Sequence, residues 1–299
     1  MSYDVGVVIV SYNSAHVIEG LLATIPQALD GLSAVTAVVD NGSTDNSLEI
    51  LRARDDCLVV ENSNTGYAAG VNRGVEALPG VETILVLNPD VRLGPGSVRS
   101  MFATLQATRA AVVAPRVLQP DGQLFRSLRR EPVLLRTAGL GWTKRPCFDE
   151  YISDPATYEH RQVVDWALGA ALLVRRDVHT ALGGWDESYF LYSEETDFSL
   201  RAKDRGWSTV YEPTAVVTHI GGASGRTVRT HVMQVLNRVR LYARRHPPYA
   251  GVAYLCLSVL SETSWVLRGQ GESIASVKAL LSPRSRPAEL GCSDTIVPR

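Results

Sequence analysis

Runs of Val, Ile and Leu alternate with helix-like segments through the first 118 residues, and this alternation limits the possible folds more than any other feature. A repeated strand–helix–strand order predicts an α/β fold with a mostly parallel, doubly wound sheet and right-handed crossovers. The expected strands are 5–11, 35–40, 57–61, 84–88 and 111–116, and the expected helices are 15–25, 44–54, 67–78 and 97–109.

The regular alternation stops after the fifth expected strand. Residues 119–162 are rich in Pro, Gly and Arg and have no clear periodicity, which favours a long insertion that faces a substrate. Residues 163–174 are apolar, with Gly169 at their middle, and predict a strand pair or one bent strand. A short helix from Asp177 and a longer one over 193–205 follow. Gly206 suits the end of that longer helix, and a further strand begins at Trp207.

The C-terminal part predicts helices. From residue 213 to 261 there is no Asp or Glu, and apolar residues from 228 to 242 recur at spacings of three and four, as in an amphipathic helix. An anionic partner, either a phosphate-bearing substrate or a membrane surface, would explain the basic residues, and a solvated helix face is an equal alternative. These residues are Arg226, Arg229, Arg238, Arg240, Arg244 and Arg245.

Residues 249–267 are apolar enough to be considered as a membrane span. Glu262 and several serines dilute the segment, so we expect it to lie on the membrane interface rather than to cross it. The tail 282–299 contains prolines and arginines and is expected to be loose.

The composition is that of a folded protein with one large domain, or one domain and an appendage. The chain has 299 residues, 45% of them hydrophobic and 20% charged, and a net charge of −1. Its cysteines match no zinc or redox spacing and favour a reduced cytosolic setting. We expect no secretion peptide, because the chain enters the first strand without a basic region or cleavage signal. Nothing predicts a nucleic-acid partner. The cysteines are Cys57, Cys147, Cys256 and Cys292.

Acidic residues follow two of the expected strands. In open α/β sheets ligands bind at the carboxyl ends of the strands, so Asp90, in the turn Asn88-Pro89-Asp90, could hold a metal or a ligand hydroxyl. Asp40 stands at the same position after the second strand. The alternative for each is local: Asp90 caps its turn, and Ser43 or Thr44 caps the next helix.

A second acidic cluster begins the helix at 193–205. Asp197 stands four residues before Arg201, the favourable order for a helical ion pair, so we assign it a structural role. One of Glu194 and Glu195 is then free to act chemically. His219 ends a strand and precedes a glycine-rich turn, where a lone histidine is more often structural than a ligand.

These motifs, in this order, resemble the family-2 inverting glycosyltransferases of the GT-A fold, and more narrowly bacterial rhamnosyltransferases. The resemblance covers roughly residues 4 to 245. It rests on Val10-Ser-Tyr-Asn13, Val38-Val-Asp-Asn-Gly-Ser-Thr-Asp45, Asn64 with Gly66 and Asn72, Leu87-Asn-Pro-Asp90, Gly183-Gly-Trp-Asp-Glu187, the start of the Glu-rich helix and His219.

The resemblance implies a role for each matching residue. Glu195 corresponds to the catalytic base and Glu194 to the acid before it, while Asp90, with His219, would hold a divalent metal, Mg²⁺ or Mn²⁺. The metal motif keeps one acid instead of two, and the usual Glu-Asp pair is Glu-Glu here. Nucleotide-sugar binding is expected at Ser11, Tyr12, Asp40, Gly66, Asn72, Asn88 and Asp90, and acceptor binding at Trp166, Gly169, Trp185 and Asp186.

The activity implied is transfer of L-rhamnose, with inversion, from dTDP-L-rhamnose to a sugar acceptor such as N-acetylglucosaminyl-diphosphoryl-polyprenol. Such an enzyme would serve cell-wall or polysaccharide assembly as a cytoplasmic protein, peripheral at the inner face of an anionic membrane. Association into a homo-oligomer is compatible with the sequence. The expected parts are a catalytic domain 1–225, with a nucleotide-binding half 1–117 and an acceptor-binding half 118–225, a helical region 226–281 for membrane association or oligomerisation, and a flexible tail 282–299.

Three alternatives compete with this assignment. The donor could be another nucleotide sugar, or the protein could be a catalytically degenerate glycan-binding or scaffold protein, which would explain the thinned metal motif. A nucleotidyltransferase could use a similar sheet, but it would usually carry a glycine-rich phosphate loop near the first strand, and residues 11–14 are Ser-Tyr-Asn-Ser.

Overall fold

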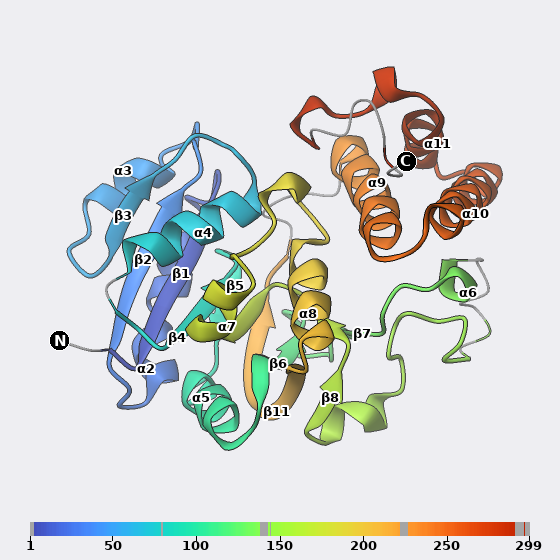
Figure 1. The fold of residues 1–299 in the computed structure, drawn as a ribbon. Helices are drawn as coiled ribbons and strands as arrows, with labels where there is room; N and C mark the ends of the chain where they lie inside the picture. The colour runs from blue at the N-terminus through green and yellow to red at the C-terminus, as the bar shows by residue number, and fades with distance from the viewer. Residues whose placement is uncertain are drawn as a thin grey trace.

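The first third of the chain forms the parallel part of a central sheet (Figure 1). A computed structural model describes residues 3–78, 80–137, 143, 145–221, 227–290 and 296. Four strands lie parallel in the order β3-β2-β1-β4, and β1 and β4 are buried along their whole length, which explains their continuous apolar sequences. They are β1 (Val5–Ser11), β2 (Ala34–Asp40), β3 (Leu58–Glu61) and β4 (Thr83–Leu87).

The other strands make the sheet mixed. β10 (Ala171–Arg175) lies antiparallel between β4 and β6 (Ala110–Leu118). β11 (Ser208–His219) runs parallel to β6 and pairs antiparallel with two short strands, β5 (Val91–Leu93) and β8 (Gln162–Val164). The predicted α/β fold with a mixed, mostly parallel sheet is confirmed.

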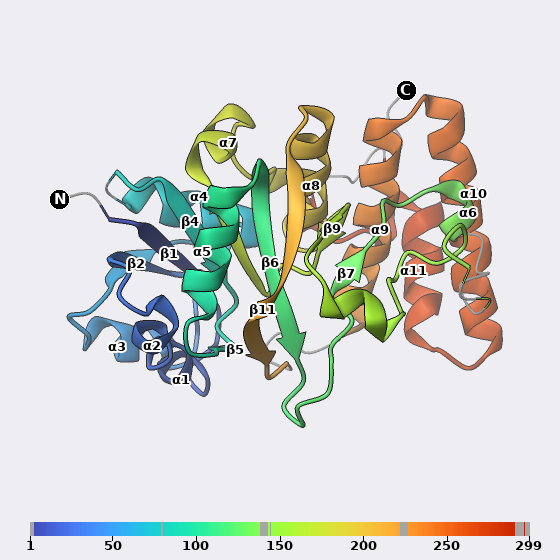
Figure 2. The same cartoon turned by 90° about the horizontal axis from the view of Figure 1, so that it is seen from below.

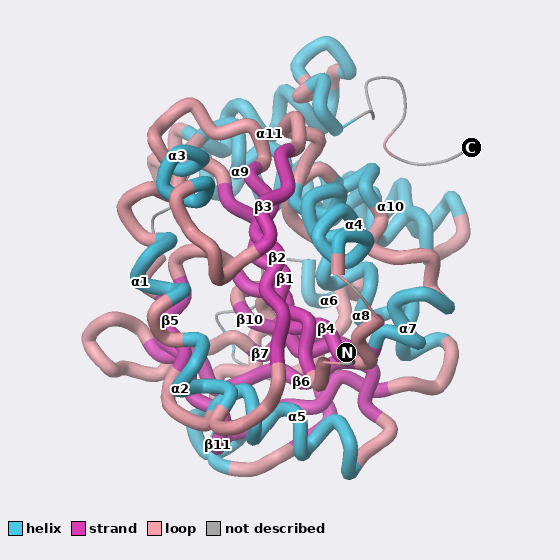
Figure 3. The backbone as a smooth tube through the Cα atoms, turned by 90° about the vertical axis from the view of Figure 1, so that its left-hand side faces the viewer, coloured by secondary structure: helices cyan, strands magenta, loops and turns pink. Residues whose placement is uncertain are grey.

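Helices cover both faces of this sheet (Figure 3). One apolar core lies between the sheet and α1, α2, α3 and α5, and a second lies between the sheet and α4, α7 and α8. The predicted helix 15–25 divides into two short ones. The bounds are α1 (Ile18–Leu22), α2 (Ile25–Leu29), α3 (Ser47–Arg52), α4 (Tyr67–Ala77), α5 (Ser97–Ala107), α7 (Arg176–Ala181) and α8 (Glu194–Asp204).

The insertion is more ordered than its sequence suggests. It contains β7 (Leu128–Arg129), α6 (Leu134–Thr137) and a 3-10 helix, Pro155–Glu159. β7 pairs with β9 (Trp166–Ala167) in a separate two-stranded sheet. The apolar segment 163–174 therefore serves three strands, of which β8 and β10 join the main sheet at different places.

Three helices form a separate bundle beside the sheet (Figures 1 and 2). They are α9 (Val228–Arg245), α10 (Pro248–Leu267) and α11 (Glu272–Leu281). Their shared core also buries Leu290 and Ile296 from the tail. Two 3-10 helices, Pro283–Ser285 and Ala288–Leu290, follow α11. The expectation of a loose tail is wrong for this packed part.

The described arginines of α9 make contacts within the protein, and the prediction that they bind an anionic partner stays a prediction. Helical spacing identified the polar face of α9 but not the acidic segments that pack on it. Arg226 lies outside the described residues. The other five pair as Arg229 with Glu289, Arg238 with Glu150, Arg244 with Asp186, Arg245 with Asp204, and Arg240 with the Ser188 carbonyl.

Candidate active site

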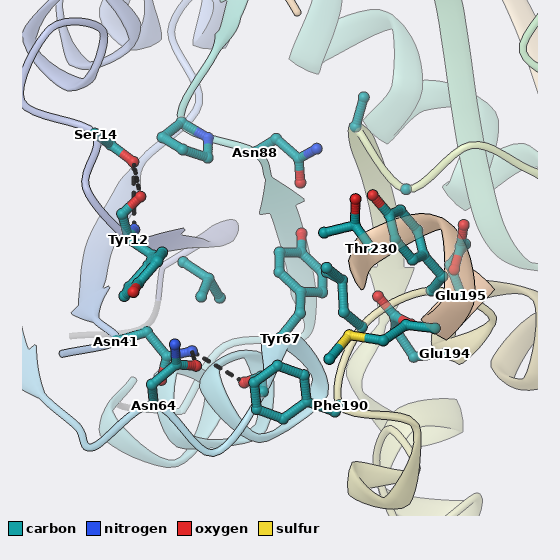
Figure 4. A pocket seen from close by; sticks show the side chains of 18 of the residues that line it. Tyr12, Ser14, Asn41, Asn64, Tyr67, Asn88, Phe190, Glu194, Glu195 and Thr230 are labelled. Carbon is teal, nitrogen blue, oxygen red and sulfur yellow. Dashed lines mark hydrogen bonds between the residues drawn. The ribbon is translucent and has the colours of Figure 1, made fainter. Parts of the chain in front are cut away.

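A pocket of about 460 Å³ opens at the carboxyl ends of β1, β2 and β4 (Figure 4). The start of α8 and the first turns of α9 close its other side. Its volume suits a small ligand, and its place at the strand ends is the one that open α/β sheets use for ligands.

The loops after β1, β2 and β3 form one wall. Tyr12, Asn41 and Asn64 line the pocket, and the loop after β1 is fixed by the Asn13 side chain, whose Oδ1 accepts the Thr44 amide at 2.7 Å. This wall offers an exposed aromatic ring and amide groups from neighbouring loops.

Ser11 and Asp40 lie directly behind this wall. They are paired in the sheet register and buried, and neither lines the pocket itself. Asp40 Oδ2 accepts the Ser43 amide at 3.0 Å, while its Oδ1 has no hydrogen-bond partner among the described residues. Asp40 therefore supports the turn and keeps one unsatisfied oxygen. Neither Ser43 nor Thr44 caps α3, whose N-cap residue is Asn46 without a side-chain hydrogen bond, so that local alternative is wrong.

Asp90 lines the pocket, and His219 lies next to it outside the lining. β11 pairs with β5, which places His219 Nε2 3.2 Å from Asp90 Oδ1. No cluster of three or more acidic, His or Cys side chains suited to a metal occurs in the described part of the chain. Asp90 and His219 fit a divalent cation only if substrate oxygens or water complete its coordination, as is common for Mg²⁺.

Two glutamates face the pocket from the start of α8. Glu194 Oε2 and Glu195 Oε2 are buried without a hydrogen-bond partner among the described residues, as is the hydroxyl of Tyr67. Figure 4 shows these side chains around one space, with Asn88 and Thr230. Burial without partners is costly, so these oxygens indicate where a polar ligand binds.

Burial also changes the acidity of this group. It raises the pKa of Glu194, which the neighbouring charge of Glu195 raises further, and it raises the pKa of Glu195. The pKa of Tyr67 is raised well above its ordinary value by burial and then by the Glu194 charge. A carboxylate with a raised pKa is a stronger base once it is ionised, which suits proton abstraction near neutral pH.

Gly169 lies beside the second glutamate. A Cβ at this position would contact Glu195 Cβ and Cγ at 3.5 Å. Its glycine therefore leaves room next to the carboxylate. Further along α8, the Asp197–Arg201 ion pair is present at 2.6 Å, so the predicted structural role of Asp197 is confirmed.

No sequence pattern indicated the conformation of the turn 189–193. Phe190, Leu191 and Tyr192 line the pocket, yet Phe190, Tyr192 and Ser193 have φ values of 47°, 70° and 76°. Such values are uncommon for residues other than Gly, Asn and Asp. Gly66 allows its backbone to lie close to this turn, because a Cβ added at Gly66 would be 2.6 Å from backbone atoms of Phe190.

Residues of the C-terminal bundle also line the pocket, and of these the sequence singled out only Arg229, as one of the basic residues of its helix. Arg229, Thr230 and Met233 come from α9, and Glu289 comes from the tail. The one indication in the sequence of their place at the pocket was that α9 follows soon after His219. Which face of a helix packs on a pocket depends on contacts between segments far apart in the sequence, so the residues themselves could not be predicted.

Besides Ser11, Asp40 and His219, four predicted site residues lie outside the pocket lining. Asn72 accepts the Trp185 amide at 3.0 Å and donates to its carbonyl at 2.9 Å. The Trp185 ring is 2% exposed and stacks on Phe198, so it packs in the core instead of facing an acceptor. Asp186 pairs with Arg244, and the Trp166 indole donates to the Arg130 carbonyl at 3.1 Å. The pocket brings together Tyr12, Gly66, Asn88, Asp90, Gly169, Glu194 and Glu195, with His219 beside Asp90.

The sequence is similar to those of known proteins. Residues 6–161 match the model of glycosyl transferase family 2. The chain is 33% identical over 245 residues to the N-acetylglucosaminyl-diphospho-decaprenol L-rhamnosyltransferase of Mycobacterium tuberculosis, covering 76% of this chain and 79% of that protein. It is 28% identical to the rhamnosyltransferase WbbL of Escherichia coli, covering 48% and 54%.

Solved structures agree on the fold. The mannosyltransferase PcManGT of Pyrobaculum calidifontis, in complex with GDP-Man and Mn²⁺, superposes with a TM-score of 0.55 at 15% identity, covering 98% of this chain and 86% of that one. The matched family model covers just over half of the chain, and the mycobacterial relative is similar across three quarters of it. The chain therefore belongs to glycosyl transferase family 2 and is a glycosyltransferase.

Proposed function

We propose that this glycosyltransferase moves L-rhamnose, with inversion, from dTDP-L-rhamnose to N-acetylglucosamine on a polyprenyl diphosphate. The similarity to the mycobacterial rhamnosyltransferase carries the proposal, because it extends over three quarters of the chain. The pocket supports it with unsatisfied carboxylates opposite polar strand-end loops.

Donor binding is assigned to the half formed by residues 1–117. The Tyr12 ring and the Asn41 and Asn64 amides suit a nucleoside, and the buried free oxygen of Asp40 lies behind them. Asn88 and Asp90 would then face the diphosphate. Asp90 and His219 would hold a divalent cation, which when bound neutralises charge on the departing nucleoside diphosphate.

Glu195 is assigned as the base. Its carboxylate takes the proton of the acceptor hydroxyl while that oxygen bonds to the anomeric carbon and the bond from this carbon to the diphosphate breaks, through a transition state of oxocarbenium character. Glu194, buried beside it, shares the negative charge of the pair. Gly169 leaves space next to Glu195 for the acceptor sugar, within the half 118–225.

A lipid-linked acceptor suits the outer surface of the bundle, residues 226–281. α10 is long and apolar enough to cross a membrane, and 28% of its most apolar stretch is buried in the protein. We assign it to peripheral contact at the inner face of the cell membrane, through its apolar side. The exposed large apolar residues there are Tyr249, Val252, Leu260, Trp265, Leu267, Ile274 and Leu281.

Thermal stabilisation by a panel of nucleotide sugars, with and without Mg²⁺ or Mn²⁺, tests the donor. A true donor stabilises the folded state by mass action, by about 2.7 kcal/mol at a hundredfold excess over its dissociation constant. We expect dTDP-L-rhamnose with the metal to raise the melting temperature most. Preference for another nucleotide sugar would refute the donor assignment. Absence of any response, together with absence of transfer, would favour a degenerate glycan-binding protein.

A further inference from the structure

The turn 189–193 joins the core of the protein to the start of α8, where the two glutamates stand. Phe190, Tyr192 and Ser193 all have positive φ. Backbone of this kind persists only where surrounding groups hold it in place. On one side the Tyr67 amide donates to the Phe190 carbonyl at 2.6 Å.

On the other side the turn is held by one side chain of α9. Asn237 is completely buried, and its Nδ2 lies 2.8, 2.9 and 3.0 Å from the carbonyl oxygens of Tyr189, Leu191 and Tyr192. An amide nitrogen has two N–H groups, so at least one of them is shared between two carbonyls. One side chain thus satisfies three carbonyls of the turn.

A neighbouring arginine fixes the orientation of this amide. Arg240 Nη1 donates to Asn237 Oδ1 at 2.9 Å and to the Ser188 carbonyl at 2.9 Å. The amide oxygen therefore faces the guanidinium and the amide nitrogen faces the turn. Asp in place of Asn would lose the donors, and Leu would lose both functions at a similar volume.

The consequence reaches the pocket directly. Phe190, Leu191 and Tyr192 line it, and Ser193, the next residue, precedes Glu194 and Glu195 without any spacer. We propose that Asn237 is a positioning residue, which holds the turn 189–193 so that the glutamates face the acceptor. This inference rests on the proposed role of Glu195 as the base.

The test compares Asn237→Leu and the smaller Asn237→Ser with a control, Leu280→Ala. Leu280 is buried in the same bundle core but does not line the pocket. Thermal unfolding establishes that each variant folds. Transfer is measured from dTDP-L-rhamnose to N-acetylglucosamine on a short-chain polyprenyl diphosphate, donor affinity by calorimetry, and hydrogen–deuterium exchange over residues 188–195.

For the Asn237 variants we expect kcat to fall about 10- to 100-fold, because small displacements of a catalytic group have large effects on rate. Donor affinity should stay unchanged, and exchange over 188–195 should rise. The acid limb of the kcat profile should move toward lower pH as the glutamates gain water. Leu280→Ala should lose stability while keeping its kcat and its exchange in this segment.

An Asn237 variant that folds and keeps kcat would overturn the inference, and so would an equal fall in kcat for Leu280→Ala. Failure of the proposed function is distinguishable, since the wild type would then transfer no rhamnose. In that case exchange decides: a rise over 188–195 in the Asn237 variants alone supports the positioning role, and unchanged exchange overturns it.

Discussion

Glu194 and Glu195 are adjacent buried carboxylates, and their different surroundings indicate different roles. Glu195 lies against Gly169, the proposed side of acceptor approach, and its Oε2 has no hydrogen-bond partner among the described residues. Replacing it by Gln keeps the shape and removes the base. We expect Glu195→Gln to lower kcat about 10²- to 10⁴-fold with little change in donor affinity. Kinetics combined with calorimetry check this, and near-normal transfer would remove Glu195 from the role.

The raised pKa values of the pair predict a pH dependence. The base must be ionised to act, so activity rises as pH increases through the raised pKa, and the acid limb of kcat/KM should lie above the ordinary glutamate range. The limb belongs to the pair rather than to one residue. In Glu194→Gln it should move to lower pH because a like charge is gone. A limb at the ordinary carboxyl pKa in the wild type would contradict this.

The same shifts predict a small change in stability. A carboxyl whose pKa is higher in the folded than in the unfolded chain favours folding at low pH, and this contribution is lost as pH rises from the unfolded value through the folded one. Glu194→Gln should therefore flatten the fall in melting temperature over that interval.

Substitution of Asp90 tests the metal assignment independently of the catalytic base. Asp90→Asn keeps the size of the side chain and removes its charge, while His219 remains. We expect the gain in nucleotide affinity that Mg²⁺ or Mn²⁺ gives to disappear, and affinity without metal to change little. If calorimetry in the presence of the metal gives the variant the same nucleotide affinity as the wild type, the role of Asp90 is refuted.

At the scale of elements, Gly66 and the turn 189–193 form one contact. Gly66→Ala adds a Cβ that meets Phe190 backbone atoms at 2.6 Å, at a φ of +106°. Gly183→Ala is a matched control, because Gly183 also has positive φ (+74°) but nothing within 4 Å of the added carbon. We expect about 1 kcal/mol of lost stability for the control and at least about 2 kcal/mol for Gly66→Ala. Urea unfolding measures both, and equal losses would show that the close contact is unimportant.

Much of the element pattern could be predicted from the sequence. β1, β2 and β4 are largely apolar because both faces of the sheet are covered, and their ends locate Tyr12, Asp40 and Asp90. The turn 189–193 could not be predicted, because Phe and Tyr give no indication of positive φ. Trp185 was assigned to the acceptor through the family resemblance alone, whereas its buried ring packs in the core against Phe198.

At the scale of the whole molecule, the outer face of α10 and α11 predicts membrane contact. Removing residues 249–299 would also expose the core of α9, so surface substitutions are the better test. We expect Leu260→Ser with Leu267→Ser to reduce sedimentation with phosphatidylglycerol vesicles, because both side chains are exposed. Val163→Ser, at an exposed apolar residue of β8, should have no effect. Unchanged sedimentation of the double variant would contradict peripheral binding through this face.

Packing between distant segments was the part of the molecule that the sequence did not predict. The arginines of α9 were visible as a basic helix, but their partners Glu150, Asp186 and Asp204 lie 40 to 90 residues away. For the same reason Thr230, Met233 and Glu289 were absent from the expected pocket.

The hydrogen bonds from Asn237 to the turn 189–193 have a consequence for recombining this enzyme with its relatives. A chimera joined near residue 225 would pair the turn of one parent with the helix of the other, and any mismatch would fall on the carbonyls before Glu194. A crossover before residue 186 would instead transfer the turn, α8 and α9 as one inherited unit. Such chimeras should therefore keep the hydrogen bonds from Asn237 that hold the turn before Glu194.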